Sequence, residues 1–149
     1  TYYDPSAGRI RWYNYGRYPA YAVAARTGVL HQANVSFSLL FGGGARYSNG
    51  EDSLFLKEFM RKGYKVYTAP VTIGREVREG ESTWFAGYND KFFFDRGVLY
   101  HYLYGRLAAP MALRFLLAHR GKLCGELSLK EAYSLMKKGI RQGKRDIIR

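Results

Sequence analysis

The chain has 149 residues, enough for one domain with a buried core, and its first residues show no initiating Met or signal pattern, so we expect part of a longer protein. The single cysteine, Cys124, excludes an intrachain disulfide and a metal site built on paired cysteines, and it favours a reducing, cytoplasmic setting. Lys and Arg outnumber Asp and Glu by 24 to 12, which favours an anionic partner: a membrane surface, a nucleic acid or a phosphorylated ligand.

The first half of the chain has patterns typical of α/β construction. Residues 21–25 form an unbroken apolar run, typical of a buried strand, and residues 26–32 predict a helical turn. Residues 51–62 have the spacing of an amphipathic helix, and Gly63 is its expected end because glycine adopts the left-handed conformation without steric cost. Residues 64–69 then predict a strand, so the order helix, glycine, strand indicates the α/β class.

The second half is predicted to be helical. Helical spacing extends from about residue 90 to His119, and Pro110 interrupts it at a position that fits the first turn of a new helix. Ser128 and Glu131 predict a capping box that opens a last helix. Residues 98–118 are long enough for a membrane span, but two arginines inside them exclude it, since a central Arg costs roughly 2.5 to 3.5 kcal/mol. We expect core-packing helices, with an interfacial position at a membrane as the alternative.

Two adjacent carboxylates, Glu51 and Asp52, follow a glycine-rich turn at the start of the predicted helix. One interpretation is structural: Ser48 caps the helix with Glu51 as its partner, and both acids complement the helix dipole by about 0.3 to 1 kcal/mol each. The other is functional: Asp52 precedes Phe55 and Leu56 by three and four residues, so it lies on the apolar face and is placed to accept a proton from a substrate hydroxyl. The two interpretations are compatible.

Three elements of the sequence together resemble a known family. They are the glycine-rich turn with its Glu-Asp pair (residues 41–56), the Arg-Lys-Gly-Tyr segment (61–67), and the Ser-Thr-Trp and Asp-Arg-Gly elements (81–97). They resemble the acceptor-side half of bacterial family-2 glycosyltransferases. The resemblance implies an α/β fold in which residues 1–90 are the C-terminal part of a GT-A (Rossmann-like) domain without its donor half, and residues 91–149 are a basic helical extension.

The resemblance also implies an activity and roles for residues. The activity is inverting transfer of a sugar from a nucleotide-sugar donor to a polysaccharide or lipid-linked acceptor, as in cell-envelope polysaccharide biosynthesis, with Mg²⁺ or Mn²⁺. Asp52 is then the general base, and Glu51 orients the acceptor or the base. Gly43 and Gly44 let the backbone approach the acceptor, and Trp84 stacks on a sugar, although a loop-anchoring role for this Trp is the alternative.

The sequence departs from the family pattern in two places. No two Asp residues are separated by one position, so the metal ligands are expected mainly in the missing half and none is assigned here. A metal- or diphosphate-holding His after the acceptor helix is also missing, and Arg75 and Arg78, in a predicted loop over the site, are candidates to bind the diphosphate; solvated loop charges are the alternative. The three His residues lack metal-ligand spacing. Asp95 and Arg96 are expected to pair with each other, with a phosphate contact by Arg96 as the alternative.

The basic tail predicts where the chain is located. The last thirty residues hold nine bases and three acids, and each base near an anionic surface contributes about 1 kcal/mol, which favours peripheral attachment to the inner face of the cell membrane. The alternative function is a non-enzymatic module that binds RNA or another polyanion, because residues 9–21 interleave Tyr and Trp with Arg. These residues do not match the aromatic motif of an RNA-binding sheet, so no specific nucleic acid is expected.

Overall fold

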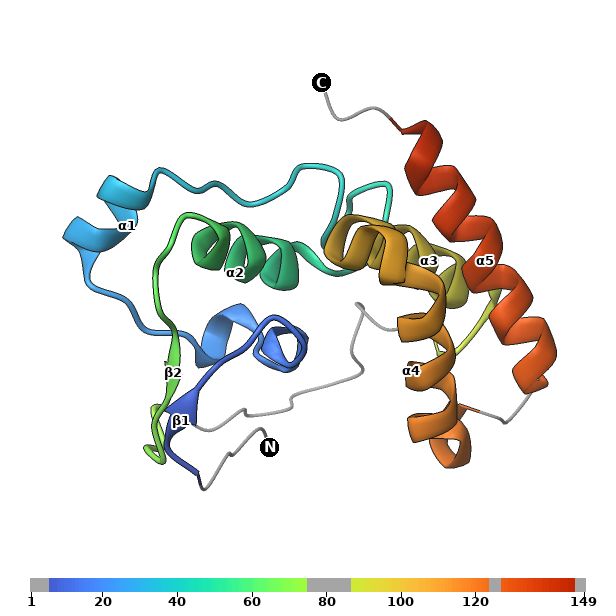
Figure 1. Ribbon diagram of the computed structural model, residues 1–149, viewed down its shortest axis with the longest axis horizontal. Coiled ribbons are helices and arrows are strands. Elements are labelled where there is room, and N and C mark those ends of the chain that lie inside the picture. The colour runs from blue at the N-terminus through green and yellow to red at the C-terminus, as the bar shows by residue number, and fades with distance from the viewer. Residues whose placement is uncertain (1–5, 75–86, 124–126, 147–149) are drawn as a thin grey trace. The chain divides into compact units, whose positions relative to one another are not determined.

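The computed structural model describes residues 6–74, 87–123 and 127–146 (Figure 1). The chain divides into two compact units, which are described separately. The first comprises residues 1–39 and 51–82, and the second comprises residues 40–50 and 83–149. The boundary falls between Gly50 and Glu51, so the glycine-rich turn belongs to the same unit as the C-terminal helices.

The first unit contains a short antiparallel pair of strands. In it β1 (Gly8–Arg9) lies beside β2 (Tyr67–Thr68), with Gly8 opposite Thr68. The backbone N–H of Ile10 donates to the carbonyl oxygen of Val66 at 2.9 Å, and the Ile10 side chain is buried. Within the described residues this is the only sheet, and the predicted strand at 64–69 is reduced to the two residues of β2. The α/β GT-A class stays a prediction.

Short helical segments fill the rest of this unit: η1 (Tyr15–Arg17), η2 (Ala20–Ala22), α1 (Thr27–Ala33) and α2 (Glu51–Arg61). The helical turn predicted at 26–32 is confirmed by α1. The buried strand predicted at 21–25 is wrong, because η2 occupies its start and Tyr21 is 71% exposed. A run made mostly of alanine offers little apolar area to bury, so the tyrosine ring alone does not hold it in a core.

The amphipathic helix predicted at 51–62 is confirmed as α2. It buries Leu56 and Phe59, and it ends just before Gly63, whose φ of 91° is the left-handed value expected of a helix-terminating glycine. Four aromatic rings are stacked along it, with centroids 4.6 Å apart between Phe37 and Phe55, 6.2 Å between Phe55 and Phe59, and 4.6 Å between Phe59 and Tyr64. The helix is therefore held by a continuous apolar face.

Three long helices form most of the second unit: α3 (Asp90–Tyr104), α4 (Ala108–Leu123) and α5 (Leu129–Arg145), with the short η3 (Gly105–Leu107) between α3 and α4 (Figure 1). Pro110 lies in the first turn of α4, as predicted, although α3 ends several residues earlier because Gly105 takes a φ of 54°. The capping box is confirmed: Ser128 Oγ accepts from the N–H of Glu131 at 3.3 Å, and the Glu131 carboxylate accepts from the N–H of Ser128 at 2.9 Å.

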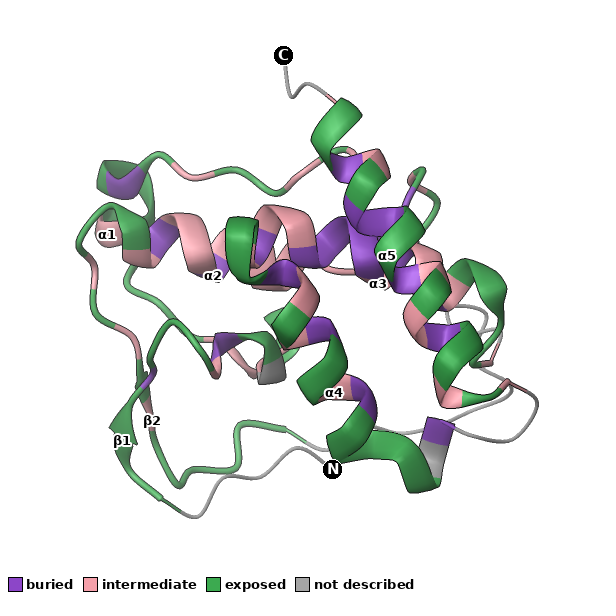
Figure 2. Ribbon diagram, turned by 45° about the vertical axis from the view of Figure 1, so that its right-hand side comes forward, coloured by how far each residue is buried: buried purple, intermediate pink, exposed green. Residues whose placement is uncertain are grey.

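The core of this unit is centred where α3 and α5 meet, and buried residues concentrate on their facing sides (Figure 2). The two helices approach closely at Gly97 and Gly139. A Cβ atom added to Gly97 would overlap the carbonyl oxygen of Met136, and one added to Gly139 would overlap that of Phe94. Only glycine therefore permits this helix crossing.

The expected pairing of Asp95 with Arg96 is wrong. The Asp95 carboxylate pairs with Lys91, and the Arg96 guanidinium carbon lies 4.6 Å from the ring centroid of Phe115 and 5.9 Å from that of Tyr100. Side chains at adjacent helix positions point in different directions, so the acid and the base find partners on different sides of α3. None of the helices in the described ranges has the length and hydropathy needed to cross a membrane.

Candidate functional site

The predicted acid pair lies in the first turn of α2, where Glu51 and Asp52 are both half-buried. The helix begins at Glu51, so Gly50 occupies the position just before it and the assignment of Ser48 as the cap is wrong. The N–H of Ser48 instead donates to the Asp95 carboxylate, which holds this residue outside the helix. Both acids remain at the positive end of the helix dipole, where negative side chains are favoured.

Asp52 lies on the buried face of α2. Leu56 and Phe59 follow it by four and seven residues, a spacing that places all three side chains on one side of a helix, and these two are 2% and 8% exposed. The short η1 packs against the same first turn, since a Cβ on Gly16 would lie 3.5 Å from Ser53 Oγ. The carboxylate of Asp52 is therefore at the start of an apolar face rather than on the solvated side of the helix.

Gly50 is fixed by two independent constraints. Its φ of 119° is a conformation that other residues rarely adopt, and an added Cβ would lie 2.5 Å from two methyl carbons of Leu99, a buried residue of α3. The backbone immediately before the acid pair therefore depends on glycine at this position.

The glycine-rich turn is closed by its own backbone. The N–H of Gly42 donates to the carbonyl oxygen of Tyr47 at 2.9 Å, and that of Tyr47 donates to the carbonyl oxygen of Leu40 at 3.0 Å. Gly44 has a φ of 79°, and both Gly43 and Gly44 are exposed. The two glycines predicted to approach the acceptor are thus open to solvent on a defined turn, in the second unit, whereas Glu51 and Asp52 belong to the first.

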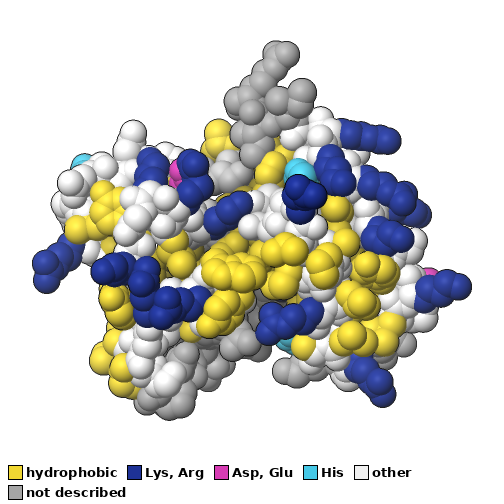
Figure 3. Space-filling model, viewed as in Figure 1, with side chains coloured by type: hydrophobic (Ala, Val, Ile, Leu, Met, Phe, Trp, Pro, Cys, Tyr) yellow, Lys and Arg dark blue, Asp and Glu magenta, His cyan; other side chains and the backbone are white. Residues whose placement is uncertain are grey.

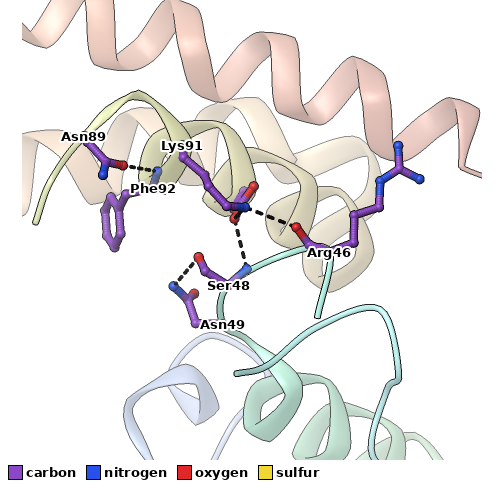
Figure 4. A network of polar contacts seen from close by, with 7 residues as sticks. Arg46, Ser48, Asn49, Asn89, Lys91 and Phe92 are labelled. Atoms are coloured by element: carbon purple, nitrogen blue, oxygen red, sulfur yellow. Dashed lines mark hydrogen bonds and ion pairs between the residues drawn. The ribbon is translucent and has the colours of Figure 1, made fainter. Parts of the chain in front are cut away.

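A buried carboxylate on α3 anchors this turn (Figure 4). Asp95 is only 2% exposed, and it accepts from the N–H of Ser48 at 2.9 Å and from Lys91 Nζ at 2.6 Å. The Lys91 ammonium also donates to the carbonyl oxygen of Arg46 at 3.1 Å. A buried charge is tolerated when it is paired and hydrogen-bonded, and here both partners also hold the turn.

A second carboxylate, Asp146, anchors the other side of the turn. It accepts from the Tyr47 hydroxyl and from Gln142 Nε2, the latter at 2.9 Å, and it lies 3.6 Å from the Arg46 guanidinium. The bond from Tyr47, aided by Gln142 and Arg46, lowers the pKa of Asp146. Burial, aided by the bond to Asp146 and its charge, raises the pKa of Tyr47 to about 12. The backbone carbonyl of Asp146 also accepts from the Tyr102 hydroxyl at 2.9 Å.

The Tyr47 and Asp146 pair predicts a pH dependence of stability. Because the pKa of Asp146 is lowered in the folded state, its contribution to stability is present above about pH 4 and is lost as the pH falls through the lowered pKa. Because the pKa of Tyr47 is raised, its contribution is present below about pH 10 and is lost as the pH rises toward 12. We expect Tyr47→Phe to reduce the loss of unfolding free energy at both extremes, measured by urea unfolding at several pH values.

Tyr64→Phe is the matched control for this prediction, because the Tyr64 ring stacks on Phe59 and its stacking does not require the hydroxyl. Its pH dependence should follow that of the unmodified chain. Identical pH profiles of unfolding free energy for Tyr47→Phe and Tyr64→Phe would show that the Tyr47 and Asp146 pair does not contribute to the pH dependence of stability.

The remaining predicted site residues, Arg75, Arg78 and Trp84, lie outside the described residues. Sequence reasoning missed the role of Asp95 and Asp146 in anchoring the turn. Their partners Ser48 and Tyr47 are 47 and 99 positions away in the chain, so no local spacing pointed to them. For Asp95 the available signal was an acid next to the apolar run at 92–94, because a buried acid rarely lacks a partner. Asp146 follows a basic helix and offered no such signal.

The described residues contain no group of three or more His, Cys, Asp or Glu side chains that would hold a metal ion. The predicted metal therefore has no ligand set in this part of the chain. In comparisons with known proteins, no family model, curated protein or solved structure matches the chain.

Proposed function

We propose that this chain is the acceptor-side part of an inverting glycosyltransferase that uses a nucleotide-sugar donor, with Asp52 as the general base. The observation that carries the proposal is the placement of Asp52: a half-buried carboxylate in the first turn of α2, on the face that buries Leu56 and Phe59, directly after a backbone position that requires glycine. The resemblance of the glycine-rich turn, the Glu-Asp pair and the Ser-Thr-Trp element to family-2 glycosyltransferases supports the same activity.

The proposed chemistry is a single displacement. Asp52 removes the proton from an acceptor hydroxyl while the hydroxyl oxygen forms a bond to the anomeric carbon of the donor sugar. The bond from that carbon to the nucleoside diphosphate breaks on the opposite face, so the configuration inverts. A carboxylate suffices as the base because the hydroxyl becomes acidic as the new bond forms.

The other site residues have supporting roles. Glu51 orients the acceptor or the base, Gly43 and Gly44 give the acceptor room beside the turn, and Trp84 stacks on a sugar. Arg75 and Arg78 bind the leaving diphosphate, for which Arg is well suited because its guanidinium pairs with phosphate oxygens in a bidentate manner.

Mg²⁺ or Mn²⁺ belongs to this proposal as a cofactor held elsewhere. The described residues contain no group of side chains that fits a divalent-metal site, and we propose that the ligands lie mainly in the donor-binding half. The acceptor is a glycan or a lipid-linked sugar. The chain would work in the cytoplasm, attached peripherally to the inner face of the membrane through its basic C-terminal residues.

A transfer screen tests the proposal. The chain, joined to its donor-binding half, is incubated with a panel of nucleotide sugars, Mg²⁺ or Mn²⁺, and glycan or lipid-linked acceptors, and both transfer and donor hydrolysis are measured. We expect one donor to give transfer well above the rate without protein. If the protein binds nucleotide sugars but no donor in the panel gives transfer, the result would argue against the proposed transferase activity.

The alternative function is polyanion binding. One observation favours it: Trp12 and Tyr13 are 56% and 52% exposed and lie in an arginine-containing segment, which offers stacking surfaces beside cations. This alternative predicts that Trp12→Ala weakens binding to single-stranded RNA and that Asp52→Asn has no functional effect.

A further inference from the structure

Helix α4 has exposed leucines that take no part in packing the helix against the core. Leu113 and Leu117 are one helical turn apart and are 44% and 56% exposed, and Leu107, in η3 just before the helix, is 51% exposed. The residues that attach α4 to the core are different ones, the buried Ala108, Ala112, Leu116 and Leu123. The exposed leucines are defined here as the α4 leucine face.

Basic residues surround the α4 leucine face. Arg106, Arg114 and Arg120 are exposed, and residues 96–125 contain no Asp or Glu at all. On an ideal helix Arg114 and Arg120 lie on either side of Leu113 and Leu117. Figure 3 shows hydrophobic side chains gathered over α4 with Lys and Arg side chains around them. This pattern is typical of a helix that lies in the plane of a membrane interface.

Helix α5 adds further positive charge to the same unit. It packs against α3 through small and apolar residues, and its bases are all exposed: Lys130, Lys137, Lys138, Arg141, Lys144 and Arg145. Its acid in the first turn, Glu131, is engaged in the capping box. Exposed leucines and an excess of positive charge in the same unit are the combination that anionic lipid headgroups and acyl chains complement.

We propose that the α4 leucine face docks on an anionic lipid membrane, with the leucines entering the interface and the arginines contacting headgroup phosphates. This goes beyond attachment through the basic tail, because charge alone requires no apolar contact. A second copy of this chain fits the face less well, since pairing two α4 helices would bring like charges together without any carboxylate between residues 96 and 125. RNA would use the arginines and leave the leucines in water.

The experiment is co-sedimentation of the 149-residue chain with vesicles of phosphatidylcholine alone or with added phosphatidylglycerol. The test variant is Leu113→Ala/Leu117→Ala, which retains helix propensity and every charge. Leu39→Ala is the matched control, since Leu39 is 95% exposed in the first unit. We expect the double variant to bind anionic vesicles about tenfold more weakly, from the loss of partly buried leucine area, and Leu39→Ala to bind as the unmodified chain does.

A charge variant separates the two parts of the contact. Arg114→Glu/Arg120→Glu should reduce binding to anionic vesicles at least as strongly as the leucine variant, by about tenfold or more at low salt. The control is Arg11→Glu/Lys65→Glu, which changes two exposed bases of the first unit and should have a smaller effect. Circular dichroism of each variant confirms that it is folded.

Three results would overturn the proposal. The first is anionic-vesicle binding by the double leucine variant that matches Leu39→Ala. The second is binding of single-stranded RNA by a chain that does not bind anionic vesicles. The third is self-association in solution that the double leucine variant abolishes while vesicle binding persists. No donor sugar is present in these measurements, so they test membrane docking separately from sugar transfer. Docking can be disproved while transfer is observed, and transfer can be disproved while docking is observed.

Discussion

Asp52→Asn is expected to abolish sugar transfer while leaving donor binding nearly unchanged. The amide has the shape of the carboxylate but does not accept the hydroxyl proton, and loss of a general base typically lowers the rate by about 10² to 10⁴-fold. The measurement is the transfer rate of the chain joined to its donor-binding half, together with the dissociation constant of the nucleotide sugar. The expected pattern is a lowered kcat with little change in donor affinity, because Asp52 is proposed to act on the acceptor.

Glu58→Gln is the matched control on the same helix. Glu58 pairs with Arg61 at 2.7 Å and takes no part in the proposed site, so its loss should leave transfer unchanged. Glu51→Gln should have an intermediate effect, since Glu51 is proposed to orient rather than to accept the proton. If the Asp52→Asn variant transferred sugar as fast as the Glu58→Gln variant, Asp52 would not be the general base.

Gly97→Ala and Gly139→Ala are expected to give the largest losses of stability. Each new methyl group would overlap a backbone carbonyl of the facing helix, so α3 and α5 would have to separate at the centre of the core of the second unit. Forcing extra atoms into a packed core costs typically 1 to 3 kcal/mol, and contacts with backbone rather than with flexible side chains place these variants at about 3 kcal/mol or more. Urea unfolding followed by circular dichroism measures the change.

Gly121→Ala is the control for these substitutions. Gly121 also lies in a helix, α4, but an added Cβ would meet no atom within 4 Å. Its replacement by alanine should therefore raise stability slightly, by up to about 1 kcal/mol, through better helix propensity. Similar unfolding midpoints for Gly97→Ala and Gly121→Ala would contradict the close α3 and α5 crossing.

The features that local sequence determined were predicted correctly. Gly63 terminates α2, Pro110 lies in the first turn of α4, and Ser128 with Glu131 forms the capping box of α5. Each depends on residues within one helical turn, where backbone conformation and hydrogen-bond capacity follow from the residue type.

Features that depend on distant partners were not predicted. The apolar run at 21–25 resembled a strand, but a strand needs a neighbour to pair with, and the sequence does not show whether one is there. Ser48 had the right spacing to cap α2, yet its N–H is held by Asp95 from α3. The anchoring of the glycine-rich turn by Asp95 and Asp146 is likewise invisible in the sequence, because it joins residues that are brought together only by folding.

The anchored turn and the acid pair belong to one continuous stretch of chain. Asp95 and Asp146 fix the turn up to Ser48, Gly50 is constrained by Leu99, and the helix carrying Glu51 and Asp52 starts at the next residue. The backbone up to Gly50 is thereby fixed by contacts within the second unit.

The configuration of the transferred sugar tests the central claim most directly. With the productive donor and acceptor from the transfer screen, the anomeric configuration of the first product is read by proton NMR before it equilibrates. A single displacement with Asp52 as base predicts an inverted configuration relative to the donor in every product molecule. A product with retained configuration would contradict the proposed mechanism.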